Sequence, residues 1–223
     1  MGTLATPLAN EASHPVRVHV EPALDERNRL TTAFRIILAI PHLILVGGPI
    51  AAVLSWTWGA ENGTRYEWGA GGVLGAVAGA IAVIAWFAIV FTGRFPEGLW
   101  SLAAYYLRWR VRAVAYTALL RDEYPPFGDA DYPAWLDLAP PMTPRDRVTV
   151  GFRLILALPQ ILAVWLLGIA WGFTTLIAWF AILFTGSYPA SLYRFGVGVL
   201  RWNTRVEAYL LLLRDEYPPF SLE

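Results

Sequence analysis

The chain has 223 residues, of which 57% are hydrophobic and only 15% are charged, and its formal net charge is zero. Soluble domains carry about 25% charged residues, so this composition excludes an ordinary soluble globule. The balanced charge argues against a nucleic-acid-binding protein, whose basic face produces a surplus of positive charge. The absence of cysteine excludes disulfides, thiolate nucleophiles and sulfur-ligated metals.

Residues 1–14 lack the basic and apolar regions of a secretory signal peptide, so we interpret them as a disordered cytoplasmic tail. The rest of the chain contains one pattern twice. The matching segments are residues 27–42 with 145–160 at an offset of 118, and residues 85–96 with 178–189 and 107–127 with 200–220 at an offset of 93. The offsets differ by 25 residues, which indicates an insertion in the first copy. We therefore divide the chain into repeat 1 (15–127), a linker (128–132) and repeat 2 (133–223).

Each repeat opens with a short run, bracketed by prolines, in which apolar and polar residues alternate. These runs are residues 16–21 and 134–139. Alternation with a period of two is typical of strands, and a lone strand would leave its backbone groups unpaired. The two runs are therefore predicted to pair with each other on the cytoplasmic face.

Two apolar stretches follow the strand in repeat 1, at residues 36–54 and 73–91. Each is close to the ~20 residues that cross the hydrocarbon core of a bilayer. Both stretches are therefore predicted to be transmembrane helices.

Repeat 2 has instead one uncharged apolar run from Leu154 to Phe184. At ~1.5 Å per residue, this run is too long for one ordinary span and short for two. Because repeat 1 divides at this point, we expect a tight hairpin that turns near residues 168–172, with spans at 152–167 and 170–184. A re-entrant or steeply tilted single helix is the alternative.

All 17 basic residues are arginines, and with these spans only Arg65 lies in a loop on the far side of the membrane. The side with the other arginines is cytoplasmic by the positive-inside rule. Both termini are then cytoplasmic. Two spans in each repeat would return the chain to its starting side, so the repeats should be parallel and related by an axis along the membrane normal.

A long helix with an arginine stripe is predicted after the second span, at residues 97–121 in repeat 1 and 190–214 in repeat 2. A helix with a basic stripe and a broad apolar flank lies in the membrane plane, with its guanidinium groups at lipid phosphates. A spanning helix is the alternative, but it would bury two or three charges at a cost of at least ~2.5 kcal/mol each. The arginines expected to bind anionic lipid are Arg108, Arg112, Arg194, Arg201 and Arg205.

Each long helix ends in the sequence Leu-Arg-Asp-Glu-Tyr-Pro-Pro-Phe, at residues 120–127 and 213–220. Acidic residues at a helix carboxyl end oppose the helix dipole, so these carboxylates should have cationic partners. We expect intramolecular ion pairs between the carboxylates Asp122, Glu123, Asp215 and Glu216 and the arginines at the start of the first spans, Arg35 and Arg153 among them. An external ligand is the alternative. No histidine accompanies the carboxylates, and we expect no metal and no cofactor.

His42 and Gln160 occupy equivalent positions, each directly after a proline in a predicted span. Polar residues at matched depth could form the site of a transporter built from repeats. They could equally form interhelical hydrogen bonds in a structural bundle, and we favour that interpretation because no other ionisable residue lies within the spans.

With these motifs in place, the chain resembles a bacterial membrane protein family, the domain of unknown function 4389 (DUF4389). The resemblance rests on the pair F-T-G-x-[YF]-P and D-E-Y-P-P-F, which occurs at residues 91–96 with 122–127 and at residues 184–189 with 215–220. The resemblance implies an integral membrane protein without an assigned activity, and it carries over no catalytic residues.

The sequence therefore predicts an all-α integral membrane protein, a tandem parallel repeat with a short strand, two transmembrane helices and an in-plane amphipathic helix in each copy. No catalytic constellation is present, so we expect a multi-pass membrane protein of structural or accessory type and not an enzyme. It would bind lipid, a membrane protein complex or further copies of itself in a bacterial cytoplasmic (inner) membrane. The alternative is a small transporter or channel with a polar site at His42 and Gln160.

Overall fold

The computed structural model describes residues 14–48, 57–59, 65–67, 71–140 and 145–223. Its elements in chain order are β1 (Val16–Val20), α1 (Arg29–Ala33), α2 (Arg35–Val46), β2 (Thr57–Gly59), β3 (Arg65–Glu67), α3 (Gly72–Thr92), α4 (Glu97–Thr117), β4 (Ala134–Leu138), α5 (Arg147–Gly151), α6 (Arg153–Thr185) and α7 (Ala190–Leu210). The predicted mostly helical fold, with one short strand at the start of each repeat, is confirmed.

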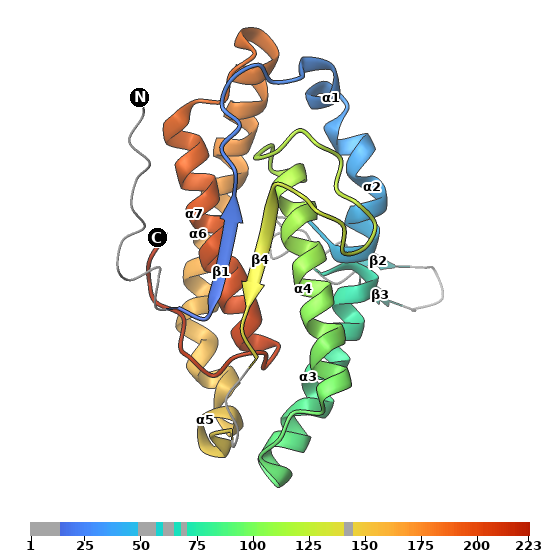
Figure 1. Ribbon diagram of the computed structural model, residues 1–223, viewed down its shortest axis with the longest axis vertical. Coiled ribbons are helices and arrows are strands. Elements are labelled where there is room, and N and C mark those ends of the chain that lie inside the picture. Colours follow the sequence, from blue (N-terminus) through green and yellow to red (C-terminus); the bar gives the residue numbers. More distant parts are fainter. Residues whose placement is uncertain (1–13, 49–56, 60–64, 68–70, 141–144) are drawn as a thin grey trace.

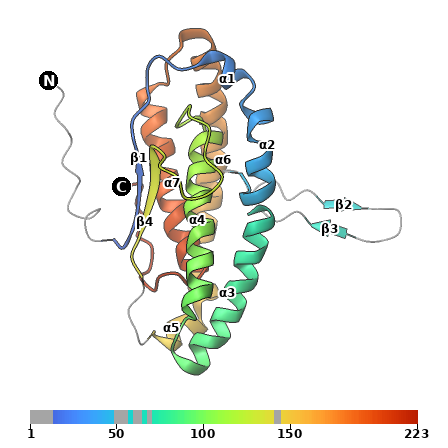
Figure 2. The same cartoon turned by 45° about the vertical axis from the view of Figure 1, so that its right-hand side comes forward.

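The elements form three layers (Figure 1). The ribbon of β1 and β4 is one outer layer and packs on α4 and α7, which contact each other in the middle layer. The other outer layer contains α2 and α3, which pack on α4, and α6, which packs on α7. Strands β2 and β3 form a separate two-stranded sheet, which lies to the side of α2 and α3 (Figure 2).

The predicted pairing of the two proline-bracketed strands is confirmed. They are antiparallel, and Val18 lies opposite Leu136, with Val16 opposite Leu138 and Val20 opposite Ala134. Val18 and Leu136 are themselves equivalent in the two repeats, so the register has local twofold symmetry about this pair. Valine and leucine of the buried strand face pack on α4 and α7, which fixes the register because a slip of one residue would turn these side chains to solvent.

This symmetry corrects one expectation. Antiparallel strands are related by a twofold axis that is perpendicular to them, and both strands run along the long dimension of the molecule (Figure 1). Helices α4 and α7 likewise run in opposite directions in Figure 1. The axis between the repeats is therefore perpendicular to the long helices, whereas parallel repeats with an axis along the helices were expected.

The expected hairpin in repeat 2 is wrong, because α6 is one continuous helix of 33 residues from Arg153 to Thr185. Its counterpart in repeat 1 is α2 followed by α3, whose 12 and 21 residues together match its length. The expected span at 73–91 coincides with α3, but α2 ends at Val46, and residues 49–54 of the other expected span lie outside the described residues.

The 25-residue insertion therefore interrupts a single helix. Val46 and Gly72 align with the adjacent residues Val164 and Trp165. The ends of α2 and α3 meet closely, since a Cβ atom on Gly72 would lie 2.6 Å from the carbonyl oxygen of Ile44. Gly72 also has a φ of +65°, so only glycine fits this junction without strain.

The short helices α1 and α5 pack on the long helix of the other repeat. The indole of Trp179 in α6 donates to the carbonyl of Thr32 at 2.9 Å, and the indole of Trp86 in α3 donates to the carbonyl of Val150 at 3.0 Å. The backbone also connects the repeats, because the Arg27 N–H donates to the Gly186 carbonyl at 2.9 Å and the Arg145 N–H donates to the Gly93 carbonyl at 3.1 Å. The short helix of each repeat therefore packs on the long helix of the other repeat, so the two repeats form one folded unit.

The amphipathic helices of the prediction are shorter than expected and lie inside the molecule. α4 ends at Thr117 and α7 at Leu210, and more than half of the side chains of each are buried between the outer layers. They are therefore not in-plane surface helices in this structure. Hydrogen bonds to protein groups allow arginines to occupy this middle layer.

Candidate functional site

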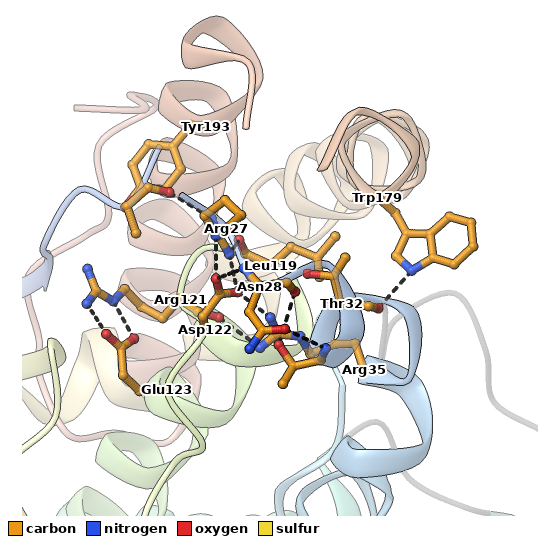
Figure 3. Close-up of polar contacts among 12 residues, drawn as sticks. Arg27, Asn28, Thr32, Arg35, Leu119, Arg121, Asp122, Glu123, Trp179 and Tyr193 are labelled. Atoms are coloured by element: carbon orange, nitrogen blue, oxygen red, sulfur yellow. Dashed lines mark hydrogen bonds and ion pairs between the residues drawn. The ribbon is translucent and has the colours of Figure 1, made fainter. Parts of the chain in front are cut away.

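A cluster of two arginines around one carboxylate lies at the end of α4 (Figure 3). Arg27 donates to Asp122 from Nε at 2.8 Å and from Nη2 at 2.7 Å, and Arg35 donates from Nη2 at 2.5 Å. The two arginine side chains are only 1% and 2% exposed, and that of Asp122 is 23% exposed. The carboxylate thus neutralises two buried guanidinium groups that come from the segment before α1 and from the start of α2.

Repeat 2 contains the equivalent cluster. Arg145 donates to Asp215 from Nη2 at 2.6 Å and also from Nε, and Arg153 donates from Nη2 at 2.5 Å. The structure thus brings together Asp122 with Arg35 and Asp215 with Arg153, as the sequence led us to expect. Arg27 and Arg145 were not among the expected partners, although both belong to the matching segments.

The backbone after each long helix turns so that the carboxylate reaches these arginines. Leu119 and Leu212 have left-handed φ values of 63° and 59°, which non-glycine residues adopt only when the surroundings hold them there. The Leu119 carbonyl accepts from Arg27 at 2.6 Å, and the Leu212 carbonyl accepts from Arg145 at 2.8 Å. The same arginine therefore holds both the turn and the carboxylate that follows it.

The guanidinium groups set the protonation of both carboxylates. Burial raises the pKa of Asp122, but hydrogen bonds from Arg27 and the charges of Arg27 and Arg35 outweigh it, so the pKa lies below its ordinary value. At Asp215 burial likewise raises the pKa, and the hydrogen bonds and charges of Arg145 and Arg153 lower it by more, so this pKa also lies below its ordinary value. Both carboxylates are thus held ionised at neutral pH.

Glu123 and Glu216 pair with the arginine two residues before them and not with Arg35 or Arg153. Glu123 is 2.5 Å from Arg121, and Glu216 is 2.5 Å from Arg214. Each of these arginines also reaches the end of a strand segment: Arg121 donates to the Glu21 carbonyl at 2.7 Å, and Arg214 donates to the Ala139 carbonyl at 3.0 Å. These second pairs attach the β1–β4 ribbon to the helix ends.

His42 and Gln160 are fully buried, and each accepts a hydrogen bond from an indole. The Trp109 indole donates to His42 Nδ1 at 3.2 Å, and the Trp202 indole donates to Gln160 Oε1 at 2.7 Å. Gln160 also donates to the Pro218 carbonyl at 2.7 Å. Each polar side chain thus joins the outer helix of its repeat to the middle helix and, for Gln160, to the Pro-Pro segment.

A largely buried ion pair between α4 and α7 has no counterpart in the repeat pattern. Arg110 of α4 donates to Glu207 of α7 at 2.7 Å and to the carbonyl of Val46, the last residue of α2, at 2.6 Å. The hydroxyl of Tyr106 donates to the same glutamate at 2.9 Å. The structure shows this cluster at the interruption of the apolar helix, whereas sequence reasoning did not single it out.

The arginines expected to bind lipid fall into two groups. Arg112 and Arg205 are buried, and they donate to the backbone carbonyls of Gly128 and Glu223. Arg194 is exposed, and Arg108 and Arg201 are partly buried, with Arg201 donating to the Val18 carbonyl at 3.3 Å. The arginine stripe is therefore largely a set of internal contacts, and lipid binding stays a prediction for its exposed members.

The outer helices carry many exposed apolar side chains, which we together call the apolar face. It comprises the exposed large apolar residues of α1, α2 and α3, from Leu30 to Phe91, and of α5 and α6, from Val148 to Phe184. Ile36 and Phe184 are each 75% exposed. α3 and α6 are both long and apolar enough to cross a membrane. Among the described residues, no group of three His, Cys, Asp or Glu side chains could hold a metal ion.

Comparison with known families gives one result. The sequence profile described as "Domain of unknown function (DUF4389)" matches residues 68–128 and 147–221, one segment in each repeat and more than half of the chain. The chain belongs to the DUF4389 family. The two matched segments agree with two tandem copies of the DUF4389 domain. No curated protein and no solved structure matches the chain.

Proposed function

We propose that this DUF4389 protein is a structural or accessory membrane protein, which keeps its apolar face in a lipid bilayer and offers exposed arginines to anionic headgroups. The observation that carries the proposal is the apolar face itself. Soluble monomers rarely expose contiguous apolar patches beyond a few hundred Å², and burying such a surface contributes roughly 25 cal/mol per Å². A bilayer is the proposed cover because the outer helices include two of membrane-spanning length and hydropathy.

The transporter alternative has less support. A transport site requires polar side chains that can exchange a protein partner for a solute. Both Trp indole donors hold the acceptors of His42 and Gln160, and the amide donor of Gln160 is taken by a backbone carbonyl. These contacts favour the structural role. Placement in a bacterial inner membrane with cytoplasmic termini, and association with a membrane protein complex or a further copy, belong to the same proposal.

Flotation with lipid vesicles tests the proposed function. Ile36 and Leu154 are equivalent residues of the apolar face, with exposures of 75% and 70%. Replacing both with aspartate should lower the fraction that floats with phosphatidylcholine–phosphatidylglycerol vesicles by at least tenfold, because each charge would enter hydrocarbon. The matched control is the pair Ser101→Asp and Ser191→Asp, at exposed positions of α4 and α7, which should float as the wild type does. A wild-type protein that is monodisperse without detergent and does not float would overturn the proposal.

A further inference from the structure

The arrangement of charge around the apolar face has a consequence for how the molecule sits in a bilayer. In α1, α2, α3, α5 and α6 the charged residues are all arginines: Arg29, Arg35, Arg147 and Arg153. Arg35 and Arg153 are buried in the carboxylate clusters, whereas Arg29 and Arg147 are exposed. Among the described residues neither Arg29 nor Arg147 is paired with a carboxylate.

These two exposed arginines mark opposite ends of the molecule. The guanidinium of Arg29 lies beside Gly186, where α6 ends, and that of Arg147 lies beside Gly93, where α3 ends. Each therefore sits at the negative end of a helix dipole of the other repeat. Because α3 and α6 end at opposite ends of the molecule (Figure 1), Arg29 and Arg147 lie at opposite ends of the apolar face.

From this placement we infer that the protein lies in one leaflet, with its long axis parallel to the membrane plane and with Arg29 and Arg147 at the same layer of anionic lipid phosphates. The inference rests on the proposed function, because it specifies how the apolar face meets the bilayer. A helix is about 10 Å across, and half of the ~30 Å hydrocarbon core accommodates one layer of such helices. The layer of α2, α3 and α6 would lie in the acyl chains, and α4 and α7 would lie above it.

A spanning orientation conflicts with the rest of the structure. The 33 residues of α6 would extend ~50 Å at 1.5 Å per residue, well beyond the hydrocarbon thickness. The β1–β4 ribbon lies halfway along the long helices (Figure 1), so spanning would carry its outward Arg17 and Asp137 to the depth of the acyl chains. A charge at that depth costs at least ~2.5 kcal/mol.

The arginines lead to the same orientation. Spanning would place Arg29 and Arg147 on opposite sides of the membrane, against the strong tendency of basic residues to remain on one side. An in-plane orientation keeps both on one side. A second copy of this chain is a poorer cover for the apolar face, because it would bring the same two arginines and no carboxylate from these helices.

Depth measurements along α6 test the inference in this cysteine-free chain. Single cysteines replace Leu154, Leu166 and Phe184, which are all exposed on the apolar face, and carry nitroxide labels in phosphatidylcholine–phosphatidylglycerol vesicles. Collision with oxygen and with a nickel chelate should give the three labels similar depths. A label at Arg17 on the ribbon is the control and should lie in water. A spanning helix would instead separate Leu166 from Leu154 by ~18 Å and from Phe184 by ~27 Å along the membrane normal, and this result would overturn the inference.

Sidedness provides an independent measurement on two exposed serines. Ser101 and Ser191 are exposed near the starts of α4 and α7, at opposite ends of the molecule. An impermeant maleimide should label Ser101→Cys and Ser191→Cys from the same side of sealed vesicles, and labelling from opposite sides would contradict the in-plane orientation. Failure of the wild type to float would instead overturn the proposed function, and spin–spin broadening of the apolar-face labels would show a second copy in place of lipid.

Discussion

Repeat 1 and repeat 2 make the same contacts at their ends but differ at their centres. Both have two arginines around one aspartate, a left-handed leucine, and an indole bonded to a buried polar side chain. At the centre, repeat 2 continues as α6, whereas repeat 1 is interrupted after Val46. The comparison shows that the helix ends are the fixed part of this fold and that the middle of the apolar helix tolerates change.

The interruption is accompanied by a charged pair between the two repeats, Arg110 with Glu207, which has no symmetric counterpart. The carbonyl of Val46, the last residue of α2, accepts a hydrogen bond from Arg110. The positions equivalent to Arg110 and Glu207 in the opposite repeats hold Asn203 and Val114. Leaving a buried carbonyl without a hydrogen bond would be costly. We therefore infer that Arg110 compensates for the interruption of the helix by the insertion.

The largest effect should come from the carboxylates that the repeats share. Asp122→Ala and Asp215→Ala each leave two buried guanidinium groups without a counter-charge, and we expect each to lower the free energy of unfolding by about 3 kcal/mol or more. Denaturant unfolding in detergent measures this. Asp129→Ala is the control, because that aspartate is exposed and lies 3.5 Å from Arg112, so the change should cost below ~1 kcal/mol. Strongly unequal losses for Asp122 and Asp215 would show that the clusters are not equivalent.

Acid should remove the stabilisation that the ionised carboxylates of Asp122 and Asp215 provide. The folded protein lowers the pKa of Asp122 and Asp215, so the unfolded chain binds their protons more readily. Their stabilisation is complete above the ordinary aspartate pKa of about 4 and is lost as the pH falls from there through the folded pKa values. The melting temperature should therefore change little between pH 7 and about pH 5 and fall below about pH 4. The double variant Asp122→Asn, Asp215→Asn should start lower and show a much smaller acid-dependent fall.

Deleting residues 47–71 tests the coupling between the insertion and the central ion pair. The deletion joins Val46 to Gly72 as Val164 is joined to Trp165, and it should lengthen the helix. Because the Val46 carbonyl would then accept a helical bond, Arg110 would lose a partner, at a cost of roughly 1–3 kcal/mol. Adding Arg110→Asn and Glu207→Val should recover about 1–2 kcal/mol relative to additive effects. Unfolding free energies of the deletion, the double substitution and their combination measure the coupling, and strict additivity would refute it.

The smallest effect is expected at the buried polar pair. Gln160 accepts from an indole and donates to a proline carbonyl, so His42→Gln should be tolerated with a change within ~0.5 kcal/mol in thermal unfolding. His42→Leu is the contrasting variant, because it leaves the Trp109 indole unpaired and should cost about 1 kcal/mol or more. If His42→Gln is as damaging as His42→Leu, the two polar residues do not have the same role.

The sequence predicted the ends of each repeat better than the middle. The strand pairing follows from alternation and the need to pair the backbone, and the aspartate pairs follow from acidic residues placed against a helix dipole. The hairpin in repeat 2 was wrong because hydrophobicity alone does not distinguish one long helix from two short ones. The alignment already indicated that α2 and α3 together have as many residues as α6, since the 25 extra residues fall between Val46 and Gly72.

Two other features had no signal in the sequence. An arginine stripe looks the same whether it faces phosphates or backbone carbonyls, so the burial of Arg112 and Arg205 could not be read from periodicity. The matching segments of the two repeats also offer similar partners, so the sequence does not show whether α1 packs on its own repeat or on α6. Arg27 and Arg145 could have been found, because both repeats carry them at the same place.

Because α1 and α5 each pack on the other repeat, some contacts of repeat 1 cannot form until repeat 2 has been synthesised. β1 leaves the ribosome before its partner strand exists, because Val18 pairs with Leu136. The Thr32 carbonyl likewise has no donor until Trp179 has been synthesised. At about 5–20 residues per second, the 118 residues that separate the paired strand centres take about 6–24 s to translate. Throughout that interval the nascent repeat 1 exposes an unpaired strand edge beside apolar helices, and both favour aggregation. We therefore expect repeat 1 to need early contact with a membrane or a chaperone before repeat 2 can pack on it.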